Sequence, residues 1–306
     1  MQTRPADFYE RDSLGNAIYE YDWTDTRSLN YDNPAVWAAQ DSCMRFWLDK
    51  GVDGFRCDAA GEMPAAFWQG VLPQLKADYP EAYFLAEAEK PELAEIFDAT
   101  YAWSLHHLLN DLAQGRKRVQ DLQEYVAADA LLYPAEGYRL TFTSNHDENS
   151  WNGTEFERMG AAADACAVLC FTLPSSQPLI YTGQEIGLSR RLAFFEKDPV
   201  TDWTPNAYTD FWQTLVALRH DNPALAPGAK GGPVVWWDAP EDMVAFHREV
   251  KGNRVIVLAN FGSAPVTRIL NLKEQYRDVF NGRVVTPPVE LSFSPGEFMV
   301  LTQIVE

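Results

Sequence analysis

The first two-thirds of the chain alternates between short apolar runs and longer segments in which apolar residues recur at helical spacing. The short runs predict β-strands, and the longer segments predict α-helices. The predicted strands cover 52–58, 83–87, 96–99, 139–144 and 178–181, and the predicted helices cover 34–50, 64–77, 105–112, 158–171 and 208–220. This alternation predicts a parallel sheet whose strands are connected by helices.

The hydrophobic pattern changes after Asn222-Pro223. Short apolar runs between Gly, Pro and Asn turns predict antiparallel strands at 234–237, 243–247, 254–258 and 298–301. We therefore predict two domains, an α/β domain over residues 1–223 and an all-β, sandwich-like domain over residues 224–306.

Charge and hydropathy exclude two classes of partner. The 306 residues include 44 Asp and Glu against 25 Lys and Arg, a net charge of −19, and such a surface repels the phosphates of nucleic acids. No apolar run approaches the roughly 20 residues that a membrane span needs. Residues 1–7 lack the apolar core of a signal peptide. The sequence as given is therefore expected to be cytoplasmic, while a periplasmic or secreted parent protein stays open.

Cysteine and histidine spacing predicts neither a disulfide framework nor a transition-metal site. Cys166 and Cys170 lie one helical turn apart in an Ala-rich segment and are expected to be buried thiols. The histidines are scattered, so we expect no metal. His106 and His107 fall in a predicted helix and are interpreted as structural.

Three predicted strands of the α/β region end in carboxylates, namely Asp58, Glu87 and Asp147. Catalytic groups of parallel α/β barrels come from these strand ends. Arg56 lies on the same strand face as Asp58, where a guanidinium would orient the ionised carboxylate. Retaining glycoside hydrolysis needs one ionised and one protonated carboxyl group. Each carboxylate taken alone is better explained as an ordinary acidic residue at the start of a loop.

The residues around these carboxylates resemble the motifs of glycoside hydrolase family 13, the α-amylase family. Residues 51–58 (GVDGFRCD) are similar to its fourth-strand motif, 84–87 (FLAE) to its fifth, 142–147 (FTSNHD) to its seventh and 178–185 (PLIYTGQE) to its eighth. The likeness runs from about Tyr9 to the C-terminus, and the four motifs occur in the family's order. The region from Phe211 to Pro223 resembles the last barrel helix, which leads into the family's β-rich C-terminal domain.

The resemblance implies a role for each of these residues. Asp58 would be the nucleophile that forms a covalent glycosyl-enzyme, and Glu87 the general acid and then base. The other matched residues would orient or bind: Arg56 would orient Asp58, and Asp147 and His146 would bind the sugar. We also expect two further substrate-binding residues, Asn145, which shares a strand face with Asp147, and Trp151 in the loop that follows.

The sequence departs from the family at its beginning. A family barrel has eight strands, and the likeness here starts just before the fourth, which predicts an N-terminally truncated, partial (β/α) TIM-type barrel of strands four to eight. The family's strand-three motif, with a sugar-binding His and a calcium-ligand Asn, has no counterpart, and Ser28 stands where the family usually has an acidic residue. We therefore expect the family calcium site to be lost and no cofactor to be bound.

A partial barrel would leave two open strand edges and an exposed inner face. The strands could close with fewer members or flatten into an open sheet, part of the chain could be disordered, or two chains could pair at their edges. We favour a homodimer. We also favour a hydrolase that cleaves α-glucosidic bonds of starch or malto-oligosaccharides over the alternative, a catalytically impaired α-glucan-binding remnant. The sequence leaves open α-1,4 or α-1,6 specificity, endo or exo attack, and hydrolysis or glucosyl transfer.

Overall fold

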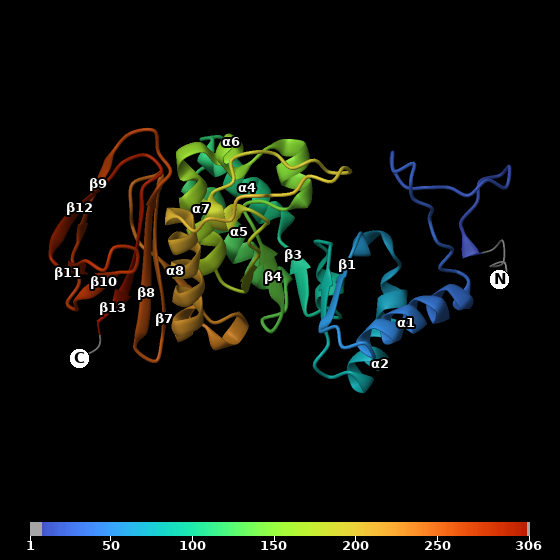
Figure 1. Ribbon diagram of the computed structural model, residues 1–306. Helices are drawn as coiled ribbons and strands as arrows, with labels where there is room; N and C mark the ends of the chain where they lie inside the picture. The colour runs from blue at the N-terminus through green and yellow to red at the C-terminus, as the bar shows by residue number, and fades with distance from the viewer. Residues whose placement is uncertain (1–7, 305–306) are drawn as a thin grey trace. The chain divides into compact units, whose positions relative to one another are not determined.

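The computed structural model describes residues 8–304, and the chain divides into two compact units, Met1–Thr100 and Tyr101–Glu306. Figure 1 labels their helices and strands. Within residues 8–304, none of the helices has the length and apolar content to cross a membrane. The predicted domain boundary after residue 223 stays a prediction.

The first unit alternates helices and parallel strands. Its elements are α1 (Pro34–Leu48), β1 (Gly54–Cys57), the short helix η2 (Ala60–Glu62), α2 (Ala65–Asp78), β2 (Tyr83–Ala86) and α3 (Pro91–Ala94), with β3 (Ala99–Tyr101) beginning at its end. Strand β2 pairs in parallel with both β1 and β3. Asn33 caps α1, because its side chain accepts the N–H of Ala35.

The core of this unit joins the inner faces of α1 and α2 to the strands. It includes Met44, Leu48, Phe67, Trp68, Leu72, Leu75, Phe84 and Phe97. Close pairing of β1 with β2 requires Gly54, since a Cβ there would lie 1.9 Å from the carbonyl oxygen of Tyr83. The residues of this core therefore place the C-terminal ends of β1 and β2 next to each other.

The second unit continues the alternation and ends in antiparallel strands. Its helical part comprises α4 (Trp103–Ala113), α5 (Val119–Leu132), β4 (Tyr138–Thr141), the π-helix η3 (Glu148–Asn152), α6 (Glu155–Met159), η4 (Gly160–Ala162), α7 (Ala163–Thr172), β5 (Ser176–Pro178), η5 (Gln184–Ile186) and α8 (Ala207–Asp221). Strand β4 pairs in parallel with β5. Two short helices, η6 (Pro223–Leu225) and η7 (Gly228–Lys230), lead into the β-rich region.

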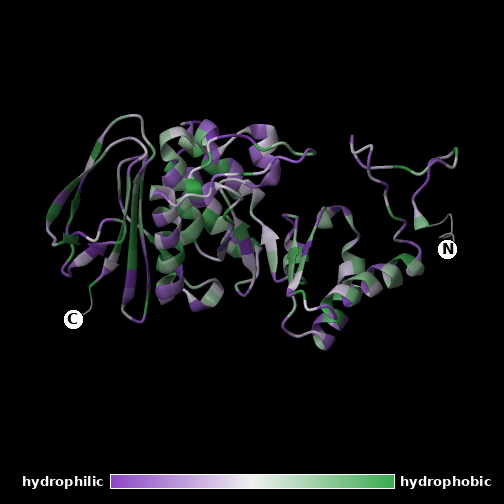
Figure 2. Cartoon of the chain, viewed as in Figure 1, coloured by the Kyte–Doolittle hydropathy of each residue, from purple (hydrophilic) through white to green (hydrophobic). Residues whose placement is uncertain are grey.

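The β-rich region consists of two layers. Its strands are β6 (Val234–Trp236), β7 (Met243–Val250), β8 (Asn253–Asn260), β9 (Val266–Leu270), β10 (Tyr276–Asp278), β11 (Val284–Val285), β12 (Val289–Phe293) and β13 (Phe298–Gln303). Six of them form one sheet in the order β11-β10-β13-β8-β7-β6, and β12 pairs with β9. Figure 2 shows how apolar β7 and β8 are.

Both faces of residues 243–246 in β7 and 255–259 in β8 are buried, which explains why these two runs are continuously apolar. Val244, Phe246, Val255 and Val257 pack with helices α4, α7 and α8, while Met243, Ala245, Ile256 and Leu258 pack with residues of β9 and β12. The six-stranded sheet therefore shares one core with the helices and a second core with the two-stranded β9–β12 sheet. The predicted antiparallel, sandwich-like character of the C-terminal strands is confirmed.

Several predicted elements differ from the observed ones. The strand predicted at 96–99 lies at Ala99–Tyr101, because Ile96 and Phe97 form the turn that follows α3. The helix predicted at 158–171 is divided into α6, η4 and α7 at Gly160, whose φ is +55°. Helix α5 was not predicted because only Val119 and Leu122 of its residues are buried. Strands β9 to β12 are short or half-exposed and were also not predicted.

A buried arginine connects the β-rich region to helix α7. Arg248, on β7, is 1% exposed and donates to the carbonyl oxygens of Thr172 (3.1 Å) and Leu173 (3.2 Å), where α7 ends. It also donates to Gly232 (2.7 Å) and Ala226 (3.1 Å). Burial lowers the pKa of Arg248 to about 9, and the charge of Arg219 adds to this effect. The guanidinium thus satisfies helix-end carbonyls that would otherwise lack donors.

We predict that Arg248→Met lowers the free energy of unfolding by about 3 kcal/mol, because buried carbonyl oxygens lose their donors. Arg248→Lys should recover only part of this loss, since one ammonium cannot reach all four carbonyls. Urea unfolding at neutral pH measures both values. The control is Arg277→Met, which removes an exposed hydrogen bond to Gly282 and should change stability by no more than about 0.5 kcal/mol. Equal effects of the two methionine variants would contradict the prediction.

Candidate functional site

The predicted catalytic carboxylates of the first unit lie side by side. In the parallel pair β1–β2, Cys57 is the register partner of Ala86. The N–H of Glu87 donates to the carbonyl oxygen of Cys57 at 2.9 Å. Asp58 and Glu87 are therefore the first residues beyond two neighbouring strands, at the sheet edge where parallel α/β folds place their reactive groups.

One guanidinium contacts both carboxylates. Arg56 Nη1 pairs with Asp58 Oδ1, and Arg56 Nη2 lies 2.7 Å from Glu87 Oε1. The sequence predicted the contact with Asp58 but not the contact with Glu87. Arg56 therefore fixes the positions of the two carboxylates relative to each other.

The two carboxylates differ in their surroundings. The Asp58 side chain is 78% exposed, whereas that of Glu87 is 17% exposed. Glu87 Oε2 also accepts the N–H of Ala59 at 2.8 Å. Ala59 has a φ of +45°, a conformation that residues with a side chain rarely adopt, and strain of this kind is typical of functional sites. Asp58 is thus open to a ligand, while Glu87 is fixed by donors on both oxygens.

The second unit presents His146 and Asp147 together after β4. His146 Nε2 lies 3.4 Å from Asp147 Oδ2, and the two side chains are 49% and 34% exposed. Burial, and then the charge of Asp147, raises the pKa of the Tyr181 hydroxyl. An exposed imidazole beside a carboxylate can hydrogen bond to neighbouring hydroxyl groups of a sugar.

Asn145 directly precedes His146 and Asp147 in the chain. It is 1% exposed, and its side-chain oxygen accepts the N–H of Glu148 at 2.7 Å. Its side-chain nitrogen is a buried donor without a hydrogen-bond partner within residues 8–304. The structure therefore shows Asn145 as a support of the turn that carries Asp147, and its predicted contact with substrate stays a prediction.

A buried hydrogen bond between two side chains supports the same turn. Glu148 Oε2 lies 3.1 Å from His106 Nε2, and the two side chains are 8% and 0% exposed. The His106 Nδ1 atom is 3.2 Å from the carbonyl oxygen of Phe142. Burial opposes ionisation of Glu148, but the hydrogen bond and charge of His106, with a hydrogen bond from Asn152, lower its pKa to about 2. His106 is structural, as predicted, and its partner Glu148 was not anticipated.

We predict that Glu148→Gln is less stable than the parent by up to about 2 kcal/mol at pH 7. Because the folded pKa of Glu148 is about 2 and its ordinary value is 4.5, this stabilisation is complete above pH 4.5 and is lost as the pH falls towards 2. Thermal unfolding of both proteins between pH 3 and 7 should show that the difference in stability between the parent and Glu148→Gln, called the gap, narrows as the pH falls. The exposed carboxylate of Glu136 provides the control, and Glu136→Gln should leave no such pH-dependent gap. A Glu148→Gln gap that is constant with pH would contradict the prediction.

Trp151 belongs to an exposed aromatic group that the sequence did not reveal. It lies in η3, is 57% exposed, and its ring centroid is 5.1 Å from that of Phe194 and 6.1 Å from that of Phe195. Phe194 also stacks on His146, with centroids 6.0 Å apart. The only signal in the sequence is an adjacent pair of phenylalanines in an otherwise polar loop.

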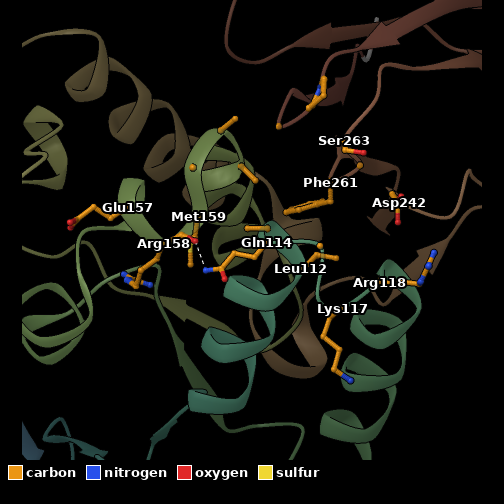
Figure 3. A pocket seen from close by; sticks show the side chains of 18 residues that line it. Leu112, Gln114, Lys117, Arg118, Glu157, Arg158, Met159, Asp242, Phe261 and Ser263 are labelled. Carbon is orange, nitrogen blue, oxygen red and sulfur yellow. Dashed lines mark hydrogen bonds between the residues drawn. The ribbon is translucent and has the colours of Figure 1, made fainter.

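A separate hollow of about 730 Å³ lies in the second unit between its helices and the β-rich region. Figure 3 shows its lining, with Gln114 hydrogen bonded to the main chain of Arg158. Two charged side chains of its lining form ion pairs, Lys117 with Asp121 and Glu157 with Arg191. None of the predicted site residues lines it within the described chain.

The remaining predictions concern metals and cysteines. Among residues 8–304, no group of three or more His, Cys, Asp or Glu side chains is arranged to hold a metal ion. The expected lack of a cofactor stays a prediction. Cys166 and Cys170 are buried free thiols, as predicted.

Comparison with known proteins supports the motif resemblance. Residues 16–204 match the family model for the α-amylase catalytic domain. The chain is 29% identical over 254 residues to α-amylase MalA of Haloarcula japonica, covering 81% of this chain and 37% of that protein. It is 25% identical over 268 residues to α-amylase 2 of Dictyoglomus thermophilum, covering 81% and 45%. The chain thus spans less than half the length of these two relatives.

A solved structure shows the same fold. The crystal structure of an α-amylase from Lactobacillus plantarum superposes with a TM-score of 0.81 at 23% identity, covering 97% of this chain and 73% of that one. The predicted fold class is therefore confirmed, with part of a (β/α) barrel followed by an antiparallel β-region.

Proposed function

Because the chain belongs to the α-amylase family, we propose that it hydrolyses α-glucosidic bonds of starch or malto-oligosaccharides with retention of anomeric configuration. The observation that carries the proposal is the Arg56 guanidinium, which contacts Asp58 and Glu87 at the ends of adjacent strands. Two carboxyl groups fixed next to each other, one exposed and one largely buried, are what double displacement at an anomeric carbon requires.

In the first step, Asp58 attacks the anomeric carbon while the bond to the leaving oxygen breaks and Glu87 gives that oxygen a proton. In the second step, Glu87 takes a proton from water, which displaces Asp58 and releases the sugar. Both oxygens of Glu87 accept hydrogen bonds in the structure. Each oxygen keeps a second lone pair, which can carry the transferred proton. His146 and Asp147 are assigned to the sugar hydroxyl groups.

The test is the stereochemistry of the products. Maltoheptaose is incubated with the chain, and proton NMR follows the first reducing ends before mutarotation. The proposal expects the α-anomer, and initial formation of the β-anomer would overturn it. If neither maltoheptaose nor starch is cleaved, an affinity gel with starch distinguishes a glucan-binding remnant from a protein that does not bind glucan.

We further propose that two chains associate through their parallel-strand edges. Within residues 8–304, β1 pairs only with β2, and β5 pairs only with β4. Unpaired strand edges are strong association sites. Light scattering during size-exclusion chromatography should give twice the mass of one chain, and a concentration-independent monomer would refute the dimer.

A further inference from the structure

Three exposed aromatic rings form one surface in the second unit. Their exposed fractions are 57% for Trp151, 39% for Phe194 and 71% for Phe195. The centroids of Phe194 and Phe195 are 4.8 Å apart, and Trp151 contacts both rings. We name these three residues the aromatic platform. Exposed apolar clusters of this kind mark binding surfaces more often than isolated exposed rings do.

The loop that carries the two phenylalanines is attached to η3 by hydrogen bonds. The N–H of Leu192 donates to Asn149 Oδ1 at 2.7 Å, and Ser150 Oγ donates to the carbonyl oxygen of Leu192 at 2.8 Å. Asn149 and Ser150 belong to η3 and directly precede Trp151 in the chain. These bonds fix the phenylalanine loop and Trp151 relative to each other.

The loop is also closed on itself. Asp198 Oδ2 accepts Arg190 Nη1 at 2.7 Å and the N–H of Ala193 at 2.9 Å. These bonds hold the loop that carries the rings in place without a ligand, so binding loses less conformational entropy than it would with a mobile loop.

The platform is continuous with the proposed sugar-binding pair. Phe194 stacks on His146, which lies beside Asp147. The rings are uncharged, and neutral sugars present apolar C–H faces that pack against aromatic rings while their hydroxyl groups stay in water. When one glucose unit of a glucan chain is bound by His146 and Asp147, the neighbouring units can lie over these rings.

We infer that the aromatic platform binds glucose units of an α-glucan chain beyond the residue held by His146 and Asp147, and that Phe195 determines a preference for longer chains. This inference rests on the proposed function and adds to it a glucan subsite formed by Phe194 and Phe195. Phe195 is the residue to test, because Phe194 also contacts His146.

The experiment measures binding of maltotriose and maltoheptaose by calorimetry in the Asp58→Asn background, which avoids hydrolysis. Phe195→Ala should raise the Kd for maltoheptaose by about 5- to 10-fold and that for maltotriose by less than about 2-fold. Phe195→Tyr keeps a ring and should bind as the parent does. The control is Phe46→Ala, which removes a ring that is 54% exposed on helix α1 and should change neither Kd.

The inference is overturned if Phe195→Ala has the same Kd as the parent for maltotriose and for maltoheptaose. It is also overturned if the parent does not bind maltoheptaose. If sugar binding is unchanged and Phe195→Ala loses a dimer that the parent forms, the platform is instead a contact between two copies. Failure of hydrolysis in the unmutated chain would refute the proposed function instead, because these binding measurements do not depend on turnover.

Discussion

Asp58→Asn is expected to lower kcat for maltoheptaose by at least about 10⁴-fold, with little change in folding. The amide is close in shape to the carboxylate but cannot form the glycosyl ester. The Asp58 side chain is mostly exposed and contacts Arg56, so its replacement removes one ion pair at the surface and leaves the core unchanged. Reducing-sugar release measures the loss, and thermal unfolding checks the fold.

The matched control is Asp53→Asn, the same chemical change at an exposed position just before β1. It should retain activity within about 2-fold. If Asp58→Asn keeps more than a tenth of the parent rate, another residue is the nucleophile. If both variants lose activity equally, the cause is the local structure around β1 and not the chemistry of Asp58.

Glu87→Gln is expected to lower kcat for maltoheptaose by about 10²- to 10⁴-fold. The glutamine cannot protonate the leaving oxygen or activate water. An aryl α-glucoside whose phenol departs without a proton should still form the glycosyl-enzyme, so a burst of phenol should precede a slow steady state. Azide needs no general base, and adding it should accelerate the second step.

Leaving-group dependence separates an acid–base role from a structural one. If Glu87→Gln acted only by disturbing the position of Arg56, the variant would be slow with all substrates alike, and azide would not restore its activity. The neighbouring Glu89 provides the comparison, and Glu89→Gln should show neither the burst nor the rescue. If Glu89→Gln shows both and Glu87→Gln shows neither, then Glu89 is the acid.

The sequence predicted the parts of the site that depend on strand position. Asp58 and Glu87 follow apolar runs that become β1 and β2, and pairing in parallel register brings such residues together. His146 and Asp147 were likewise placed at the end of a strand. Period and spacing predict the strand positions because the geometry of a parallel sheet is regular, whereas the roles of these residues came from the motif resemblance.

The sequence did not predict contacts that depend on distant loops. Phe194 meets Trp151 only because Leu192 bonds to Asn149, a residue 43 positions earlier in the chain. Asn145 shares a strand face with Asp147 in sequence, yet the turn directs its side chain into the interior. The first outcome depends on a tertiary hydrogen bond that no local pattern encodes, and the second on a local bond between Asn145 and the N–H of Glu148.

The contacts of Arg248 limit how the β-rich region can be exchanged between family members. Its guanidinium reaches across from β7 to the end of α7, and Gly231 leaves room for it, since a Cβ there would lie 2.5 Å from Arg248 Nη2. A C-terminal region grafted from a relative must therefore bring both an arginine in this register and a residue without a side chain opposite it. Without them, the graft would leave the carbonyl oxygens of Thr172 and Leu173 without the arginine donor.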